Sequence, residues 1–184
     1  DTNRSPPCDF PAESGMTLAR VDYLFGKGPK SIERVMTLAQ TAHKGQVDKS
    51  GEPYFSGHLI RVAEAVSKHM DQRAGDYAIK LAFLHDIVED THVRLIDIAK
   101  MYGMQVATDV GTLTRDTTAG SETYMQYIAQ LCETGTVEAL LVKKCDLEDH
   151  LRQVPGLTIP DSLAERYTKA LDMVGAAYKE KRRR

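Results

Sequence analysis

A histidine directly followed by an aspartate, His85-Asp86, lies within the helical pattern LAFLHDIVED. Neighbouring residues on an α-helix point about 100° apart, so both reach one ion only at a helix end or kink, or with the ion beside the axis. Glu89 and Asp90 follow one turn later and place two carboxylates on the same side. Such a cluster repels itself unless a cation or basic ligand lies within it. A solvated acidic helix end is the alternative interpretation of Glu89 and Asp90.

Two further residues are candidates to complete a metal site. His58 opens a segment whose apolar face is otherwise complete, although a histidine there can equally be a core or capping residue. Asp146 lies in the apolar-to-basic segment ALLVKKCDLEDHL, where burying a carboxylate without a partner is costly. With His85 and Asp86, they offer two imidazoles and two carboxylates to one divalent cation, such as manganese or iron. Water activated by that ion can attack phosphorus, with the two carboxylates one turn later orienting it or exchanging a proton.

The elements that position these residues are predicted to be helices. Apolar residues recur at helical spacing along the chain, and neither a run of strands nor an internal repeat is evident. The fold class is therefore all-α. We expect helices from about Ser31, with further helices near 58–70, 74–88, 95–102, 106–113, 123–133, 137–152 and 161–181.

Composition sets the wider limits. The 184 residues suit one domain, with residues 1–15 as a disordered leader or tag and residues 16–184 as the folded unit. The formal net charge of −2 argues against broad binding to nucleic acid. We expect no membrane partner, because no apolar run approaches the roughly 20 residues of a membrane span. Three cysteines are poor material for a disulfide framework, which favours a cytoplasmic location.

Four sequence blocks resemble the HD-domain phosphohydrolase superfamily, in particular the small alarmone hydrolases related to the hydrolase half of the Rel/SpoT proteins and to metazoan SpoT homologues. The resemblance spans about residues 31–175 and implies an HD-domain helical bundle. The blocks are AHKGQVDKSGEPY at 42–54, HLIRVAEAV at 58–66, AFLHDIVEDT at 82–91 and LVKKCDLEDHL at 141–151.

The resemblance implies roles for the candidate residues. The ion is usually manganese, and the implied reaction removes the 3′-pyrophosphate of guanosine tetra- or pentaphosphate. The phosphorylated nucleotide is then the expected partner, and the oligomeric state is left open. The implied metal ligands are His58, His85, Asp86 and Asp146, and the implied catalytic pair beside the attacking water is Glu89 and Asp90.

Four more residues are candidates for holding the substrate. Lys49 takes the place of a basic residue in the family's loop, and Arg115 and Tyr167 lie where related proteins hold phosphate or ribose. His150 replaces an asparagine and can still donate a hydrogen bond. A surface or packing role is the alternative for Lys49, Arg115 and Tyr167. We expect His43 to be a packing or surface residue, with Lys143 and Lys144 in solvent and Cys145 a buried thiol.

Departures from the family pattern concern the substrate more than the metal. Asp48 replaces a basic residue that helps to hold guanine, and one extra residue separates Tyr54 from His58. Leu59 replaces a common proline. Other substrates therefore remain open: an adenosine alarmone, NADPH or a phosphomonoester. A non-catalytic nucleotide-binding regulator is the third alternative.

Overall fold

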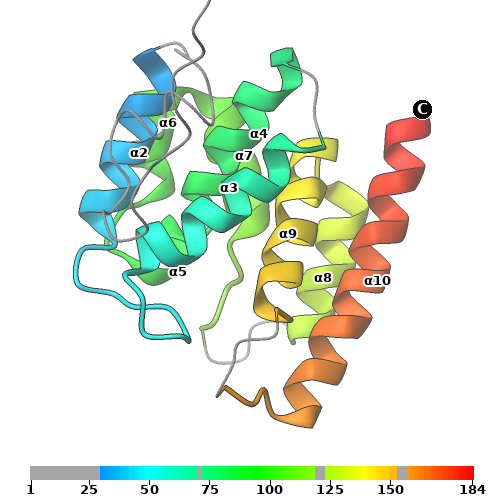
Figure 1. Cartoon of the computed structure of the whole chain (residues 1–184). Helices are drawn as coiled ribbons and strands as arrows, with labels where there is room; N and C mark the ends of the chain where they lie inside the picture. The colour runs from blue at the N-terminus through cyan, green and yellow to red at the C-terminus, as the bar shows by residue number, and fades with distance from the viewer. Residues whose placement is uncertain (1–29, 70–71, 119–122, 153–156) are drawn as a thin grey trace, which may run out of the picture.

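The computed structural model describes residues 30–69, 72–118, 123–152 and 157–184, and these residues form a helical bundle (Figure 1). The described residues contain no strand, and their extended structure consists of isolated bridge positions, such as the bridge between Val47 and Pro53. The all-α prediction is confirmed. The expected leader over residues 1–15 and the expected domain boundary lie outside the described residues.

The bounds of the helices agree with most of the predicted ranges. Thr123 and Thr136 cap two of them, each accepting a hydrogen bond from a backbone N–H of the first turn. No helix of the described residues is long and apolar enough to cross a membrane. The helices are α2 (Lys30–Ala42), the π-helix η1 (Phe55–Leu59), α3 (Ile60–Ser67), α4 (Gln72–Leu84), α5 (Ile87–Asp90), α6 (Leu95–Tyr102), α7 (Met104–Leu113), α8 (Tyr124–Thr134), α9 (Val137–His150) and α10 (Asp161–Arg183).

Helix α9 is the centre of the bundle. It packs against α3 and α4 on one side and against the long helix α10 on the other, while α10 also covers α8 (Figure 1). A helix surrounded in this way is apolar on most of its faces. Leu140, Leu141, Val142 and Leu147 are accordingly buried, and so is Cys145, as predicted. Asp146 is therefore buried as well. It lies near the C-terminal end of α9, which the loop after α2 contacts.

The structure corrects the predicted helices at two places that matter for the site. The range 74–88 is not one helix: α4 ends at Leu84, His85 and Asp86 form a turn, and α5 adds one further turn. The helix expected to begin at His58 instead begins with the π-helix, in which the N–H of Ile60 reaches the carbonyl of Phe55. A π turn holds one residue more than an α turn. The extra residue between Tyr54 and His58 is accommodated there.

Candidate metal centre

Four side-chain atoms converge where η1, the turn after α4 and α9 meet. His58 Nε2 lies 3.3 Å from His85 Nε2 and 3.3 Å from Asp146 Oδ1. Asp86 Oδ2 lies 2.9 Å from His85 Nε2 and 3.5 Å from His58 Nε2. Ligands held about 2 Å from a divalent ion are themselves separated by roughly 3 to 3.5 Å. The spacing of the His58, His85 and Asp146 atoms therefore suits a single ion, and Asp86 lies beside this group.

Both histidines turn the same nitrogen towards this centre. His85 Nδ1 donates to the carbonyl of Ala82 at 2.8 Å, and His58 Nδ1 donates to Asp149 Oδ2 at 2.8 Å. Carbonyl and carboxylate oxygens only accept hydrogen bonds, so each Nδ1 carries the proton. Each Nε2 is left to face the convergent carboxylates, which is the arrangement that a metal ligand requires.

The burial and the contacts of the Asp146 carboxylate indicate whether these residues fit a cation. Its side chain is 1% exposed, and both carboxylate oxygens lack a hydrogen-bond partner among the residues that the structure describes. Lys143 Nζ lies 2.8 Å from Oδ2 and His150 Nε2 lies 3.1 Å from Oδ1. A buried carboxylate without hydrogen bonds is costly. A divalent cation between Asp146 and the two histidines provides the missing partner, so the donor set fits.

Electrostatics favour positive charge at this point. Burial lowers the pKa of a histidine, but Asp86 and Asp146 outweigh it and raise the pKa of His85 to about 9. The pKa of His58 is also raised well above its ordinary value, because the neighbouring carboxylates of Asp146 and Asp149 outweigh burial. The site therefore favours positive charge, which protons or a divalent cation can supply.

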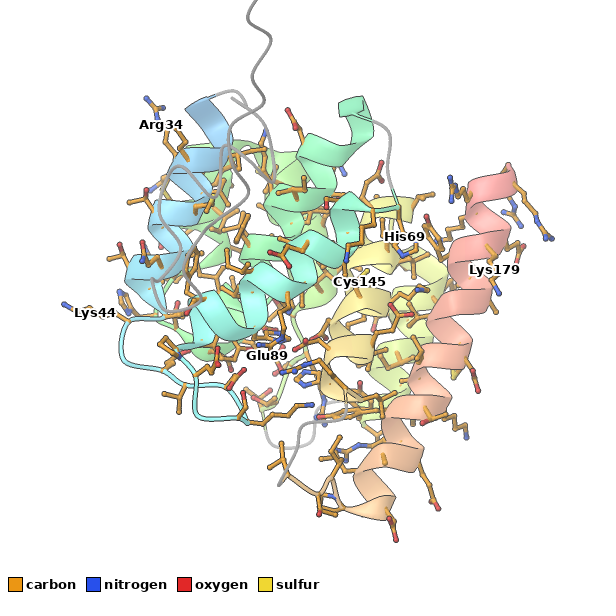
Figure 2. The ribbon with its side chains drawn as sticks, in the orientation of Figure 1. Arg34, Lys44, His69, Glu89, Cys145 and Lys179 are labelled. Carbon is orange, nitrogen blue, oxygen red and sulfur yellow. The ribbon has the colours of Figure 1, made fainter. Side chains whose placement is uncertain are left out.

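Glu89 and Asp90 lie on the single turn of α5, and Figure 2 shows Glu89 at the end of the bundle next to that helix. Glu89 Oε2 accepts from the backbone N–H of Arg115 at 3.2 Å. The N–H of Asp90 donates to the carbonyl of Asp86 at 2.9 Å. Partial burial, followed by repulsion from Asp86, raises the pKa of Asp90, and burial raises that of Glu89 as well.

A cavity of about 240 Å³ opens beside these carboxylates. Arg115, His150 and Tyr167, three of the four predicted substrate residues, line it together with Asp86 and Asp146. Their roles stay predictions, but they share one space with the metal site. The remaining lining residues are cationic, acidic or aromatic: Lys143, Arg166, Glu89, Asp90, Tyr54, Tyr124, Tyr127.

Lys49 lies elsewhere. Its ammonium group donates to the backbone carbonyls of Asp149 and His150, and it is not among the described residues that line the cavity. Cations are favoured at the C-terminal end of a helix, where carbonyls lack partners. In this structure Lys49 therefore caps α9, and its role in holding the substrate stays a prediction.

Asp48, expected to face the base of the substrate, points into the protein. Its Oδ1 accepts from the N–H and hydroxyl of Ser50 at 2.8 and 2.7 Å, and its Oδ2 accepts from Arg61 at 2.9 Å. Burial opposes ionisation, but these hydrogen bonds lower the pKa of Asp48 to about 2. The charge at position 48 is therefore neutralised inside the fold rather than offered to a ligand.

Comparisons with known proteins agree with this geometry. No family model matches the chain. It is 29% identical over 129 residues to guanosine-3′,5′-bis(diphosphate) 3′-pyrophosphohydrolase of Haemophilus influenzae, covering 65% of this chain and 18% of that protein. It is 32% identical over 78 residues to the bifunctional (p)ppGpp synthase/hydrolase SpoT of Escherichia coli, covering 42% of this chain and 10% of that protein. The chain thus spans less than a fifth of the length of these relatives.

A solved structure gives the same answer for the fold. A metazoan SpoT ortholog that hydrolyses ppGpp superimposes with a TM-score of 0.67 and 24% identity, covering 82% of this chain and 86% of that one. The resemblance to the HD-domain alarmone hydrolases is confirmed. Hydrolases of this kind imply a divalent metal, and the described residues of this chain that cluster for one are His58, His85 and Asp146, with Asp86 beside them.

Two residues at this site, Tyr54 and Lys143, were not predicted from the sequence to belong to it. The hydroxyl of Tyr54 donates to Asp86 Oδ2 at 2.5 Å. Lys143, expected in solvent, is only 11% exposed and lies over the ring of Tyr127. Its position three residues before Asp146 is the signal that helical spacing offered. His43, by contrast, is a buried packing residue that stacks on Tyr54, within the alternatives predicted.

Proposed function

We propose that this chain is a metal-dependent phosphohydrolase of nucleotides, and specifically a guanosine-3′,5′-bis(diphosphate) 3′-pyrophosphohydrolase. The observation that carries the proposal is that Asp86 and Asp146, which meet His58 and His85 in the interior, also line a cavity rich in cations and aromatic rings. The sequence relatives bear this activity in their names. Because the chain matches only a part of them, the activity is proposed here rather than transferred.

His58, His85, Asp86 and Asp146 would hold the ion, and we propose manganese. When bound, a divalent ion supplies Lewis-acid chemistry: it makes water a nucleophile at neutral pH and offsets the charge of a phosphate. Two nitrogen and two oxygen ligands suit such an ion and leave further positions open. The cytoplasmic location predicted from the cysteine content stays a prediction, with Cys132 and Cys145 both free.

The chain's own residues then have separable tasks. Asp90 and Glu89, with raised pKa values, orient the attacking water and take its proton. The water oxygen joins the phosphorus attached to the ribose 3′ oxygen, the bond between that oxygen and phosphorus breaks, and the 3′ oxygen takes up a proton. Guanosine tetraphosphate thus gives GDP and pyrophosphate.

The substrate's charges and rings have matching groups in the cavity. Guanidinium groups of Arg115 and Arg166 can bind phosphate oxygens through paired hydrogen bonds. Tyr167 is stacked on His150 with ring centroids 5.2 Å apart, and Arg166 lies 5.1 Å from the centre of the Tyr124 ring. We propose that this aromatic wall packs against the nucleoside and that the cations hold its phosphates.

The test begins with protein stripped by a chelator and reloaded with Mn²⁺. Incubation with guanosine tetraphosphate should release GDP and pyrophosphate in equal amounts, and Asp86→Ala should abolish the release. Asp172→Asn, at an exposed position on α10, serves as the control and should retain activity. Failure of the reloaded protein to act on any 3′-pyrophosphorylated nucleotide would refute the proposal.

A second candidate keeps the site and changes the substrate. Aromatic rings stack on any base, because stacking is sequence-tolerant. The described cavity wall offers Tyr124, Tyr167 and His150 for that purpose, which would also accept an adenosine alarmone, NADPH or a phosphomonoester. A side-by-side panel of these substrates with Mn²⁺ ranks the candidates by kcat/KM. Binding of guanosine tetraphosphate without any turnover would instead favour the nucleotide-binding regulator.

A further inference from the structure

A buried ionic cluster links the metal centre to the loop after α2. Arg61, on α3, donates from Nη2 to Asp48 Oδ2 at 2.9 Å and to Asp149 Oδ2 at 2.9 Å. Its Nε donates to Asp149 Oδ1 at 2.6 Å. The Asp48 and Asp149 side chains are 4% and 7% exposed. One guanidinium therefore joins two carboxylates from segments far apart in the sequence.

Asp149 is the member of this cluster that reaches the metal centre. Its Oδ2, besides accepting from Arg61, accepts from His58 Nδ1 at 2.8 Å. The opposite nitrogen of the same ring, Nε2, is the atom that faces Asp146 and His85. The direction of Asp149 thus fixes both which nitrogen of His58 is protonated and where its other nitrogen points.

The cluster restrains Asp149 from several sides. The two hydrogen bonds from Arg61 hold the plane of the carboxylate, since a guanidinium matches it in a paired geometry. Lys49 binds the backbone carbonyls of Asp149 and His150 and so fixes the end of α9. One departure from the family pattern, Asp48, thus meets Asp149 at Arg61. His85, by comparison, is oriented by a backbone carbonyl alone among the described residues.

We propose that Asp149 is a positioning residue for the metal ligand His58, and that Arg61 with Asp48 holds Asp149 in place. The proposal rests on the metal site of the proposed function. Carboxylates that accept from the far nitrogen of a ligand histidine typically change metal affinity about 10- to 100-fold when removed. The loop carrying Asp48, expected to read the substrate, then acts on the metal site through Arg61.

The experiment measures Mn²⁺ affinity by titration calorimetry on chelator-stripped protein, without substrate. Asp149→Ala should weaken binding about 10- to 100-fold, and Asp149→Asn, which keeps an acceptor oxygen, should weaken it less. The matched control is Glu148→Gln on the same turn of α9. Glu148 pairs with Lys144 at the surface, so its variant should bind Mn²⁺ as the wild type does.

A second measurement separates this inference from the metal site itself. In the metal-free protein, NMR should detect the hydrogen-bonded Nδ1 proton of His58 as a slowly exchanging signal that is lost in Asp149→Ala and kept in Glu148→Gln. Wild-type affinity in Asp149→Ala, or an unchanged Nδ1 signal, would overturn the positioning role. Absence of Mn²⁺ binding by the wild type would overturn the proposed metal site, and the Nδ1 signal would then decide alone whether Asp149 orients His58.

Discussion

Asp48 is a buried carboxylate whose contribution to stability depends on pH in a defined direction. Its pKa falls from the ordinary 3.8 to about 2 in the fold, because hydrogen bonds from Ser50 and Arg61 outweigh the cost of burial. A lowered pKa stabilises the fold at every pH above the unfolded value, and this stabilisation is lost as pH falls through the folded value. The window is therefore about pH 4 down to about pH 2. Each unit is worth about 1.4 kcal/mol, which gives about 2 kcal/mol at neutral pH.

Asp48→Asn removes this charge, and we expect it to lower the free energy of unfolding by about 2 kcal/mol at pH 7. For a chain of this size the loss corresponds to a fall in Tm of about 4 to 8 °C. Urea unfolding of wild type and variant at pH 7, 5, 4 and 3 should show the difference shrinking only below pH 4. Asp172→Asn, at an exposed position on α10, is the control. A difference that is absent at pH 7, or constant down to pH 3, would show that Asp48 is not held as described.

The same geometry reverses an expectation from the sequence about position 48. If the loop read the base, restoring arginine there would raise turnover of guanosine substrates. The structure instead predicts that Asp48→Arg places a second guanidinium against Arg61, where a buried like-charge pair is costly. We expect this variant to unfold more readily than Asp48→Asn and to gain no activity on guanosine tetraphosphate. A stable, more active Asp48→Arg protein would contradict this.

Three further substitutions test other contacts of the site. In Gly57→Ala the added methyl group would lie 2.8 Å from Asp48 Oδ2. We therefore expect the free energy of unfolding to fall by about 1 to 3 kcal/mol. An unchanged Tm in thermal unfolding would count against this packing. Tyr54→Phe removes the hydroxyl that donates to Asp86, and calorimetry should show Mn²⁺ affinity falling about tenfold, whereas equal affinity would leave Tyr54 without a role. Lys143→Met removes a cation beside Asp146 at the cavity. If Lys143 binds a phosphate of the nucleotide, KM should rise. A change confined to kcat would argue against phosphate binding by Lys143.

The helices were largely readable from the sequence, because they depend on local patterns. Apolar spacing gave α6 over the range that the structure has, and α9 and α10 to within a few residues. The helix end expected at His85-Asp86 is also present, since α4 ends just before this pair. Features that depend on residue type and short sequence spacing can be predicted before the fold is known.

The directions of the loop side chains were not readable in this way. Whether Asp48 faces a ligand or the interior depends on Arg61, thirteen residues away and on another helix. Lys49 is drawn to carbonyls a hundred residues later in the chain. The first contact forms only when this loop packs against α3, and the second only when it packs against the end of α9. A basic residue in a loop therefore predicts a partner with acceptor oxygens. The packing of the fold decides whether that partner is the substrate or the backbone.

The π-helix at Phe55–Leu59 has a consequence for how chain length can vary near the metal. One added residue would turn all later positions of an α-helix by about 100°, moving the apolar residues Val62, Ala63 and Val66 of α3 off the core that now buries them. The wider turn takes up the residue at once, so α3 keeps its phase while His58 Nε2 still faces His85 and Asp146. An insertion beside His58 is thus confined to a single turn. Alignments of this chain with its relatives should place the gap inside that turn, and a fixed spacing from Tyr54 to His58 is not required of this fold.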